Sequence, residues 1–375
     1  MAIEIQGEYT SAKIFSDEED KEVINQTLDI CNHPIFEDAK VRIMPDCHKG
    51  KGCTIGFTST MPKNGEIIPN IIGVDQSCGM LAIKIKDCKT TREYYKLDKV
   101  IRTNIPGGTG GKRKKVHTWV ENTELKENII KACKDYTRED YESELQKIGT
   151  LGAGNHFISL EKGTSGLYLI IHSGSRNFGN KLALELQKKA IETNCYKDGY
   201  FKQLSYLKGK DAQDYLFWAK VCNEYATLSR KIMAKEILEN MDWDSLEEIE
   251  TVHNYIGKDM IIRKGAISCK QNEKVLIPIN MAYGSFIALG KGNEDWNNSG
   301  PHGAGRVLSR TQAKETLTMK DYKTSMKGVH STCISTGTLD EAPMAYKNGD
   351  IIKELITPTA EILDHLIPVY NFKAS

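Results

Sequence analysis

Asp75 and Cys78 are two potential metal ligands that lie three residues apart in the stretch 71–80, which reads IIGVDQSCGM. An aspartate carboxylate and a cysteine thiolate both bind metal ions, and one turn of chain can present both to a single site. The alternative is a buried cysteine beside a turn-forming aspartate, because free cysteine often packs as a small hydrophobic residue. The apolar run before Asp75 predicts a buried strand that ends at this turn.

Three histidines extend this set of candidate ligands. His156, His172 and His253 each lie at the edge of a strand-like run, next to small or polar residues. Each alone could be a hydrogen-bonded core residue, but with Asp75 and Cys78 they offer five N, O and S donors. Five donors exceed the four of a closed tetrahedral zinc site and could serve two ions if the thiolate bridges them. Two ions suit phosphate chemistry, since they neutralise developing charge and orient an in-line attack.

His302 differs from these histidines because it lies among small residues in the segment 299–306, SGPHGAGR. The glycines leave the imidazole accessible, and a neutral imidazole can attack a phosphorus atom to form a covalent phosphoramidate. The guanidinium of Arg306 and the hydroxyl of Ser309 could then hold phosphate oxygens. Four other histidines lie in polar surroundings without a motif, and we expect structural or solvent-exposed roles for them: His33, His117, His330 and His365.

A second cluster, Asp46, Cys47 and His48, lies in a turn rich in glycine and lysine. These side chains could ligate a metal, but a loop of this kind more often orients its neighbours by hydrogen bonds. Lys49 and Lys51, which lie beside glycines in the same turn, could instead receive a phosphate group.

The elements that must position these residues alternate between strands and helices, which predicts an α/β fold. Apolar runs predict strands within 41–57, 81–85, 157–160, 167–172 and 251–256, and several short strands within 259–290. Helical spacing of apolar and charged residues predicts helices within 17–30, 118–148, 179–194, 211–240, 312–328 and 349–366. The tail, 368–373, is apolar enough to dock on the rest of the chain.

Composition narrows the class of protein. With 51 basic and 50 acidic residues the formal net charge is only +1, so any nucleic acid must be held by a local patch. One basic run exists, Lys112 to Lys115, and it is either a solvated linker or a clamp on a polyanion. No apolar segment approaches the ~20 residues of a membrane span. Without a visible secretory signal, the ten cysteines predict reduced thiols in a cytoplasmic protein.

Seven motifs occur in an order that resembles the RtcB family of RNA ligases, from about residue 40 to the tail. They are residues 44–50, 73–80, 151–157, 172–176, 263–266, 302–306 and 344–347. The resemblance implies a single compact α/β domain, residues 1–375, with layered β-sheets around a metal site and flanking helices. It also implies that Asp75, Cys78, His156, His172 and His253 bind two manganese ions, with Cys78 between them.

The same resemblance implies an activity. A GTP- and manganese-dependent ligase would join an RNA end that carries a 3′-phosphate or a 2′,3′-cyclic phosphate to a 5′-hydroxyl end, in RNA repair or tRNA splicing. His302 would be the catalytic nucleophile and carry GMP; whether an activating protein takes part is left open. The implied nucleotide-binding residues are Asn155, Asn280, Ser285, His302, Gly303, Ala304, Gly305, Arg306, Tyr346 and Lys373. The alternatives are a nucleotidyltransferase that caps 3′-phosphate ends without joining them and an inactive RNA-end-binding protein.

The chain departs from the family pattern at three places. Ser77 replaces a glycine, Ser159 replaces a glutamate, and residues 279–282 replace a Gly-Ser-Met-Gly run, so that an amide, Asn280, stands near the expected phosphates. Ser159 cannot copy the two acceptors that a carboxylate offers to guanine, which predicts a GTP preference weakened by roughly 1–3 kcal/mol. Glu161 would point to the same face of a strand and could substitute only if the pocket is shifted.

Overall fold

The computed structural model describes residues 2–16, 19–86, 91–194 and 200–374, and its largest element is a seven-stranded sheet. The strand order is β12-β13-β15-β6-β7-β5-β8, and every neighbouring pair is antiparallel. These strands are β5 (Gly79–Ile85), β6 (Phe157–Lys162), β7 (Leu167–Ser173), β8 (Ser245–Val252), β12 (Lys274–Asn280), β13 (Gly284–Gly290) and β15 (Ala360–Phe372).

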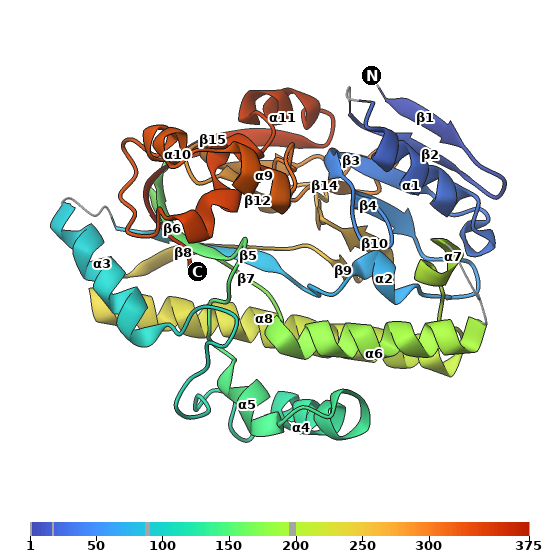
Figure 1. Cartoon of the computed structure of the whole chain (residues 1–375), viewed down its shortest axis with the longest axis horizontal. Helices are drawn as coiled ribbons and strands as arrows, with labels where there is room; N and C mark the ends of the chain where they lie inside the picture. The colour runs from blue at the N-terminus through green and yellow to red at the C-terminus, as the bar shows by residue number, and fades with distance from the viewer. Residues whose placement is uncertain (1, 17–18, 87–90, 195–199, 375) are drawn as a thin grey trace.

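A six-stranded sheet lies beside the first in Figure 1, in the order β1-β2-β3-β4-β10-β9. Its strands are β1 (Ile3–Gln6), β2 (Ser11–Ile14), β3 (Val41–His48), β4 (Ile55–Thr60), β9 (Tyr255–Ile256) and β10 (Ile261–Lys264). A two-stranded ribbon pairs β11 (Ala266–Ser268) with β14 (Ser299–Pro301), so that the segment just before His302 is held against the strand that follows β10.

Helices cover the lower face of the seven-stranded sheet in Figure 1, where the long α8 lies along β5 and β7. Leu81 and Leu169 from the sheet share one apolar core with Met233 and Ile237 from α8, which is why a broad apolar face runs along this helix. The helices are α1 (Lys21–Cys31), α2 (Pro69–Ile72), α3 (Thr91–Asn104), α4 (Glu124–Ala132), α5 (Tyr141–Gln146), α6 (Arg176–Asn194), α7 (Tyr200–Gln203), α8 (Lys210–Met241), α9 (Arg310–Thr316), α10 (Met319–Ser325) and α11 (Gly349–Leu355).

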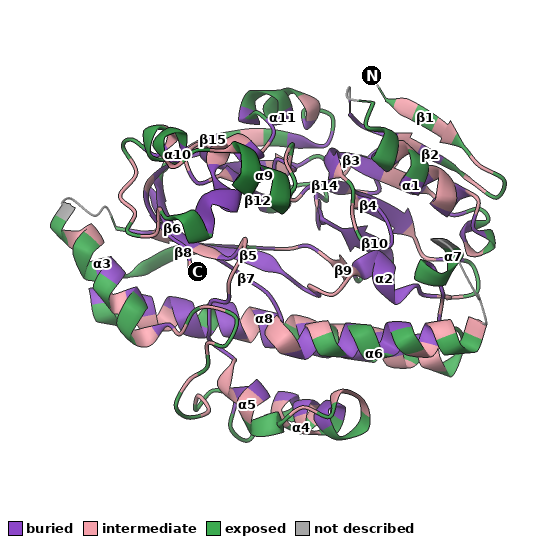
Figure 2. Cartoon of the chain, in the orientation of Figure 1, coloured by how far each residue is buried: buried purple, intermediate pink, exposed green. Residues whose placement is uncertain are grey.

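The predicted α/β class and the layered sheets with flanking helices are confirmed, and two local predictions are wrong. The run before Asp75 is not a strand: it forms the short buried helix α2, because Pro69 sets a helical φ at the first position (Figure 2). The predicted helix 349–366 ends at Leu355, and the chain then enters β15, in which buried residues alternate with more exposed ones from Asp364 to Tyr370, as in a strand. β15 includes most of the tail, which docks as expected.

None of the helices in the described ranges is both long enough and apolar enough to cross a membrane.

Candidate metal and nucleotide site

The five candidate metal ligands come together because three neighbouring strands end at the same edge. β5 lies between β7 and β8, and Gly79 at its start is opposite both Ser173 and Val252. Cys78 therefore precedes β5 where β7 ends with His172 and Ser173 and where His253 follows β8. His156 directly precedes β6, whose first residue pairs with His172. Antiparallel register, not sequence proximity, places these side chains at one point.

Cys78 belongs to two groups of possible ligands whose donor atoms lie within 4.8 Å of one another: Cys78, His172 and His253 form one group, and Asp75, Cys78 and His156 form the other. Its Sγ atom lies 3.1 Å from His172 Nε2 and 3.4 Å from His156 Nε2. The Asp75 carboxylate lies 3.9 Å from His156 Nε2. One shared thiol between two groups is the geometry that a bridging thiolate requires.

The charge state of these groups fits a cation. Burial lowers the pKa of His156 and His253 and brings that of His172 to about 3, so all three imidazoles are neutral and can ligate. His172 Nδ1–H donates to the Asn155 carbonyl at 3.1 Å, which leaves Nε2 facing the thiol. His253 Nδ1 is buried without a hydrogen-bond partner among the described residues. Burial and the Asp75 charge raise the pKa of Cys78 well above its usual value, and a bound cation would offset both.

Arg230 holds the two turns that carry the ligands. Its guanidinium is fully buried and donates to the Ser173 carbonyl at 2.8 Å and the Ser77 carbonyl at 3.3 Å, while Glu250 balances its charge. Ser77 has a φ of 56°, in the left-handed region that disfavours residues with a Cβ. Glycine adopts this conformation with little strain, which explains why a glycine suits this position. Ser77 adopts the same conformation at some cost in backbone strain, and the turn still forms.

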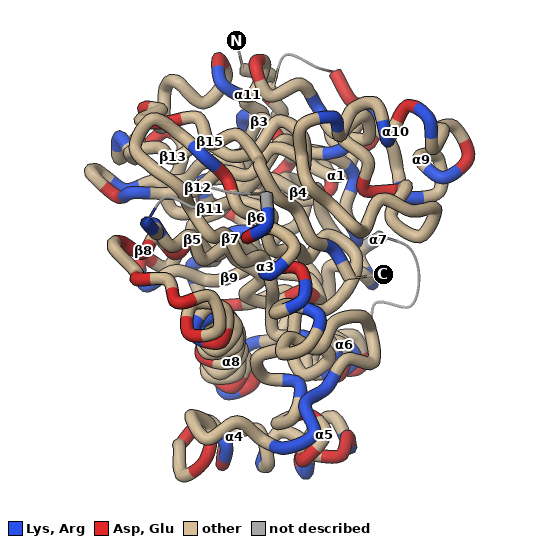
Figure 3. The backbone as a smooth tube through the Cα atoms, turned by 90° about the vertical axis from the view of Figure 1, so that its left-hand side faces the viewer, with Lys and Arg blue, Asp and Glu red and all other residues tan. Residues whose placement is uncertain are grey.

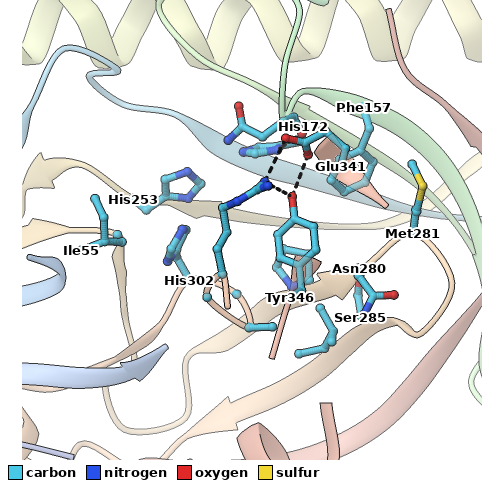
Figure 4. Close-up of a pocket in the computed structure, with 18 of the residues that line it drawn as sticks. Ile55, Phe157, His172, His253, Asn280, Met281, Ser285, His302, Glu341 and Tyr346 are labelled. Atoms are coloured by element: carbon cyan, nitrogen blue, oxygen red, sulfur yellow. Dashed lines mark hydrogen bonds and ion pairs between the residues drawn. The ribbon is translucent and has the colours of Figure 1, made fainter. Parts of the chain in front are cut away.

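His302 lies next to the ligand groups and is fixed by Asp46. The Nδ1–H of His302 donates to Asp46 Oδ2 at 2.6 Å, and the backbone N–H groups of His302 and Gly303 donate to the same oxygen. The His302 ring centroid is 4.8 Å from that of His253 (Figure 4). Asp46 is buried and belongs to neither ligand group, so the cluster at 46–48 orients a neighbour, which was one of the two interpretations of the sequence.

A cavity of about 420 Å³ opens beside these residues, and one part of its lining is strongly charged. Glu341, on the 3₁₀ turn η4 (Thr336–Glu341), accepts from Tyr346 at 2.7 Å and pairs with Lys373 at 2.9 Å, Arg310 at 2.6 Å and Arg306 at 3.3 Å. Figure 4 shows Glu341 and Tyr346 in contact, with His302 and His253 together on another side of the cavity.

Another part of the cavity lining is polar, and no cation of the described residues pairs with its carboxylate, Glu161. Ser159 donates to Glu161 Oε1 at 2.9 Å, while Glu161 Oε2 and Asn371 Oδ1 are buried without hydrogen-bond partners in the described ranges. Burial raises the pKa of Glu161 to about 7, against the opposing effect of the Ser285 and Ser159 hydroxyls. Ser159 and Glu161 lie on one face of β6, as the two-residue period of a strand requires.

The structure places all ten predicted nucleotide-binding residues around this cavity. Ser309 is elsewhere: it caps α9 by accepting from the Gln312 N–H, so its predicted phosphate contact finds no support. Asn280 lines the cavity, but its Oδ1 accepts from the N–H groups of Ala282 and Tyr283 and shapes the turn after β12.

Sequence reasoning missed Glu341 and Arg310, and neither has a local signal. Glu341 lies three residues before one of the seven motifs and Arg310 four residues after another, but only the folded chain shows that they pair. Among the four histidines without a motif, His33 is fully buried and packs edge-on against Phe36 and Tyr206, so its role is structural despite its polar neighbours in sequence.

Comparisons with known proteins agree with this arrangement of residues. The family model described as "tRNA-splicing ligase RtcB" matches residues 26–374. The "RNA-splicing ligase RtcB1" of Escherichia coli ATCC 25922 is 32% identical over 367 residues, covering 86% of this chain and 87% of that protein. The "RNA-splicing ligase RtcB" of E. coli K12 has the same identity and coverage. The "tRNA-splicing ligase RtcB" of Nanoarchaeum equitans is 26% identical and covers 94% of this chain and 91% of that protein.

Proposed function

This chain belongs to the RtcB family, and we propose that it is a GTP-dependent RNA ligase that joins 3′-phosphate or 2′,3′-cyclic phosphate ends to 5′-hydroxyl ends. The observation that carries this proposal is the placement of His302. Asp46 fixes one nitrogen of its ring at 2.6 Å, beside the metal-ligand groups and at the wall of a cavity with three cationic side chains. A nucleophile, cations and an orienting carboxylate are the parts that nucleotidyl transfer needs.

His302 would start the reaction. With Nδ1–H donated to Asp46, the Nε2 lone pair attacks the α-phosphorus of GTP, a P–N bond forms, and the bond to the β-phosphate breaks to release pyrophosphate. Asp46 stabilises the positive charge that the ring gains. An oxygen of the RNA 3′-phosphate then attacks the same phosphorus and frees His302. Finally the 5′-hydroxyl oxygen loses its proton and attacks the RNA phosphate, and GMP leaves. Where the RNA end is a 2′,3′-cyclic phosphate, water opens the ring before these transfers begin.

The five ligands Asp75, Cys78, His156, His172 and His253 fit two divalent cations, which we propose to be manganese. The cations would neutralise the charge that develops on phosphate oxygens during each transfer. A mixed N, O and S donor set accepts several transition metals, so the choice of manganese comes from the family and not from the donors.

Glu161 is our candidate for reading the guanine base. Phe157 and Tyr346 line the same cavity and offer aromatic faces to a base, while Glu161 Oε2 has no hydrogen-bond partner among the described residues. An ionised carboxylate accepts from both the ring N–H and the amino group of guanine, which adenine cannot match. Ser159, in place of the family's glutamate, supports Glu161 by its hydrogen bond. We therefore propose that GTP preference is kept, against the weaker preference that Ser159 alone predicts.

The first test is covalent labelling of the protein with radiolabelled GTP and manganese. We expect an acid-labile, base-stable adduct, as a P–N bond gives, which is lost in His302→Ala and formed more slowly in Asp46→Asn. His365→Ala, which changes a histidine outside the cavity, is the matched control. An adduct that persists in His302→Ala would place the nucleophile on another residue.

A second assay separates joining from capping. RNA with a 3′-phosphate is incubated with GTP and manganese, with and without a second strand that carries a 5′-hydroxyl. Joined product with the second strand supports ligation, whereas GMP-capped RNA that is never converted to joined product would favour the capping alternative.

Metal content tests the bridging cysteine. We expect Cys78→Ala to lose more metal than any single His→Ala variant, because it removes a ligand from both groups. Cys222→Ala removes a buried thiol from α8, outside the site, and should keep full metal content. Full occupancy in Cys78→Ala, measured by elemental analysis of the purified protein, would contradict the bridge.

A further inference from the structure

The basic run Lys112 to Lys115 contains one residue that differs in role from the other three. The Arg113 guanidinium donates to the Ile148 and Gly149 carbonyls at 3.1 and 2.7 Å and forms a two-point ion pair with Glu236 on α8. Its own backbone N–H donates to the Gln146 carbonyl. Arg113 is therefore an anchor that fixes the segment to α8 and to the chain that leads to His156.

The three lysines beside this anchor face solvent. Lys112, Lys114 and Lys115 are exposed and form no ion pair within the described ranges. Figure 3 shows this run of Lys and Arg close to α4 and α5. Because Arg113 already holds the backbone in place, a polyanion that binds these lysines pays little extra conformational entropy for the loop.

An exposed tryptophan follows the lysines on the same segment. The Trp119 side chain keeps 40% of its surface exposed, and its backbone N–H donates to His117 Nδ1. Lys235 of α8 lies 4.8 Å from the centre of the indole ring and also pairs with Glu239 at 3.4 Å. A partly exposed indole on the same segment as three exposed lysines is a combination that binds single-stranded nucleic acid, in which bases stack and phosphates meet cations.

The segment begins at the edge of the candidate active site. The Gly108 N–H donates to the Gly152 carbonyl at 2.9 Å, and Arg176 donates to the Gly108 carbonyl at 3.0 Å. Gly152 packs so closely on His156 and Arg176 that a Cβ there would collide with both. The chain from Gly108 to the lysines therefore starts beside the residue that packs on the ligand His156.

We propose that residues 108–119, the RNA shelf, bind the single-stranded RNA behind the reacting end, with phosphates on Lys112, Lys114 and Lys115 and a base stacked on Trp119. This inference rests on the proposed function for the identity of its ligand. A single strand fits better than a duplex, because the bases of a duplex are stacked on one another and leave no face for Trp119. The charges favour RNA over a protein partner, since three exposed lysines within four residues complement regularly spaced phosphates.

The test measures binding of a fluorescent single-stranded RNA with a 3′-phosphate to the full chain, in EDTA and without GTP, over a range of salt. Changing Lys112, Lys114 and Lys115 together to Gln should weaken binding and flatten the plot of log K against log salt by up to about 2, at about 0.7 for each contact. The control changes three exposed lysines of the α10 region, Lys320, Lys323 and Lys327, to Gln. An equal effect in both triple variants, or an unchanged slope in the first, would overturn the shelf.

Trp119→Ala should weaken single-strand binding roughly 5- to 100-fold, and Trp119→Phe should restore part of it. Phe201→Ala, which removes an equally exposed aromatic ring on α7, is the control and should bind as the unchanged protein does. If Trp119→Ala binds normally, or loses duplex binding to the same extent, the stacking contact is wrong.

Each of the two proposals can be contradicted without the other. The GTP adduct, measured on the unchanged protein without RNA, reports on the proposed function alone. If that adduct is absent while the shelf variants still weaken RNA binding, the ligase proposal fails and the shelf stands. If the adduct forms but shelf variants bind RNA normally, the shelf fails and the ligase proposal stands.

Discussion

Two buried glutamates line one cavity, and their pKa values move in opposite directions. Glu161 and Glu341 are each 3% exposed. Burial raises the pKa of Glu161 to about 7, because only hydroxyl groups oppose it. Burial also raises that of Glu341, but the charges of Lys373 and Arg310 outweigh this effect and bring the pKa to about 2. A glutamate side chain is therefore permanently charged at position 341 and titrates near neutral pH at position 161.

The difference in pairing determines which kind of ligand can bind beside each glutamate. Both carboxylate oxygens of Glu341 are already paired. An anionic ligand must therefore compete with Glu341 for Arg306, Arg310 and Lys373. Glu161 Oε2 has no hydrogen-bond partner among the described residues. A ligand that donates a hydrogen bond to this oxygen therefore forms it without breaking an existing hydrogen bond. The cations around Glu341 are thus suited to an anionic group, and Glu161 is suited to a group that donates hydrogen bonds.

Glu341→Gln should give the largest effect, because it keeps the shape and leaves three clustered cations without their counter-charge. We expect the free energy of unfolding at pH 7 to fall by about 3–5 kcal/mol, as for other broken buried ion pairs. The folded pKa is below the unfolded one, so this stability is present above about pH 4.5 and is lost as pH falls towards 2. Urea unfolding of the variant and of the unchanged protein at pH 7 and pH 3.5 measures the loss of stability and its dependence on pH. A variant as stable as the unchanged protein at pH 7 would remove the contrast between the two glutamates.

Glu161→Gln should act in the opposite sense. The folded pKa is above the unfolded one, so the unchanged protein gains stability from the protonated carboxyl below about pH 4.5 and loses it as pH rises through 7. A shift to about 7 corresponds to about 3 kcal/mol. The stability of the variant relative to the unchanged protein should therefore rise between pH 5 and pH 8.5. A pH-independent difference in urea unfolding would show that Glu161 does not titrate in this range.

Base recognition gives a smaller effect at the same residue. The unchanged protein should bind GTP more tightly than ITP, which lacks the amino group, by about 1–3 kcal/mol. Glu161→Gln should lose most of this difference, and GTP binding by the unchanged protein should strengthen as pH rises through 7 and the carboxyl ionises. Calorimetric titration with both nucleotides measures this. Discrimination that survives in Glu161→Gln would assign the base to another residue. Equal binding of GTP and ITP by the unchanged protein would instead support the weaker preference predicted from Ser159.

Ser159→Ala should give the smallest effect. It removes the hydroxyl that donates to Glu161 Oε1 at 2.9 Å, and one such bond contributes about 1 kcal/mol. The midpoint of the pH-dependent GTP binding should move up by less than about one pH unit, because the ionised carboxylate loses a donor. A midpoint that does not move would mean that Ser159 fills space without supporting Glu161.

Local sequence was sufficient for the residues whose role depends on their own segment. A strand end marked His172, and the period of two placed Ser159 and Glu161 on one face. It failed where a proline changed the local structure, as at Pro69, and where a helical pattern gave way to a strand in 360–372. Apolar runs are ambiguous between buried helix and buried strand, and only packing decides between them.

The sequence by itself determined which chemical groups this protein has and in what order they come, including a lone histidine among glycines and five possible ligands. Only the tertiary structure decided their partners: Asp46 for His302, three cations for Glu341, and an anchoring role for Arg113 among three exposed lysines. The physical reason is that a pKa or an ion pair depends on groups within a few ångströms. In this chain those groups come from positions as far apart as 46 and 302.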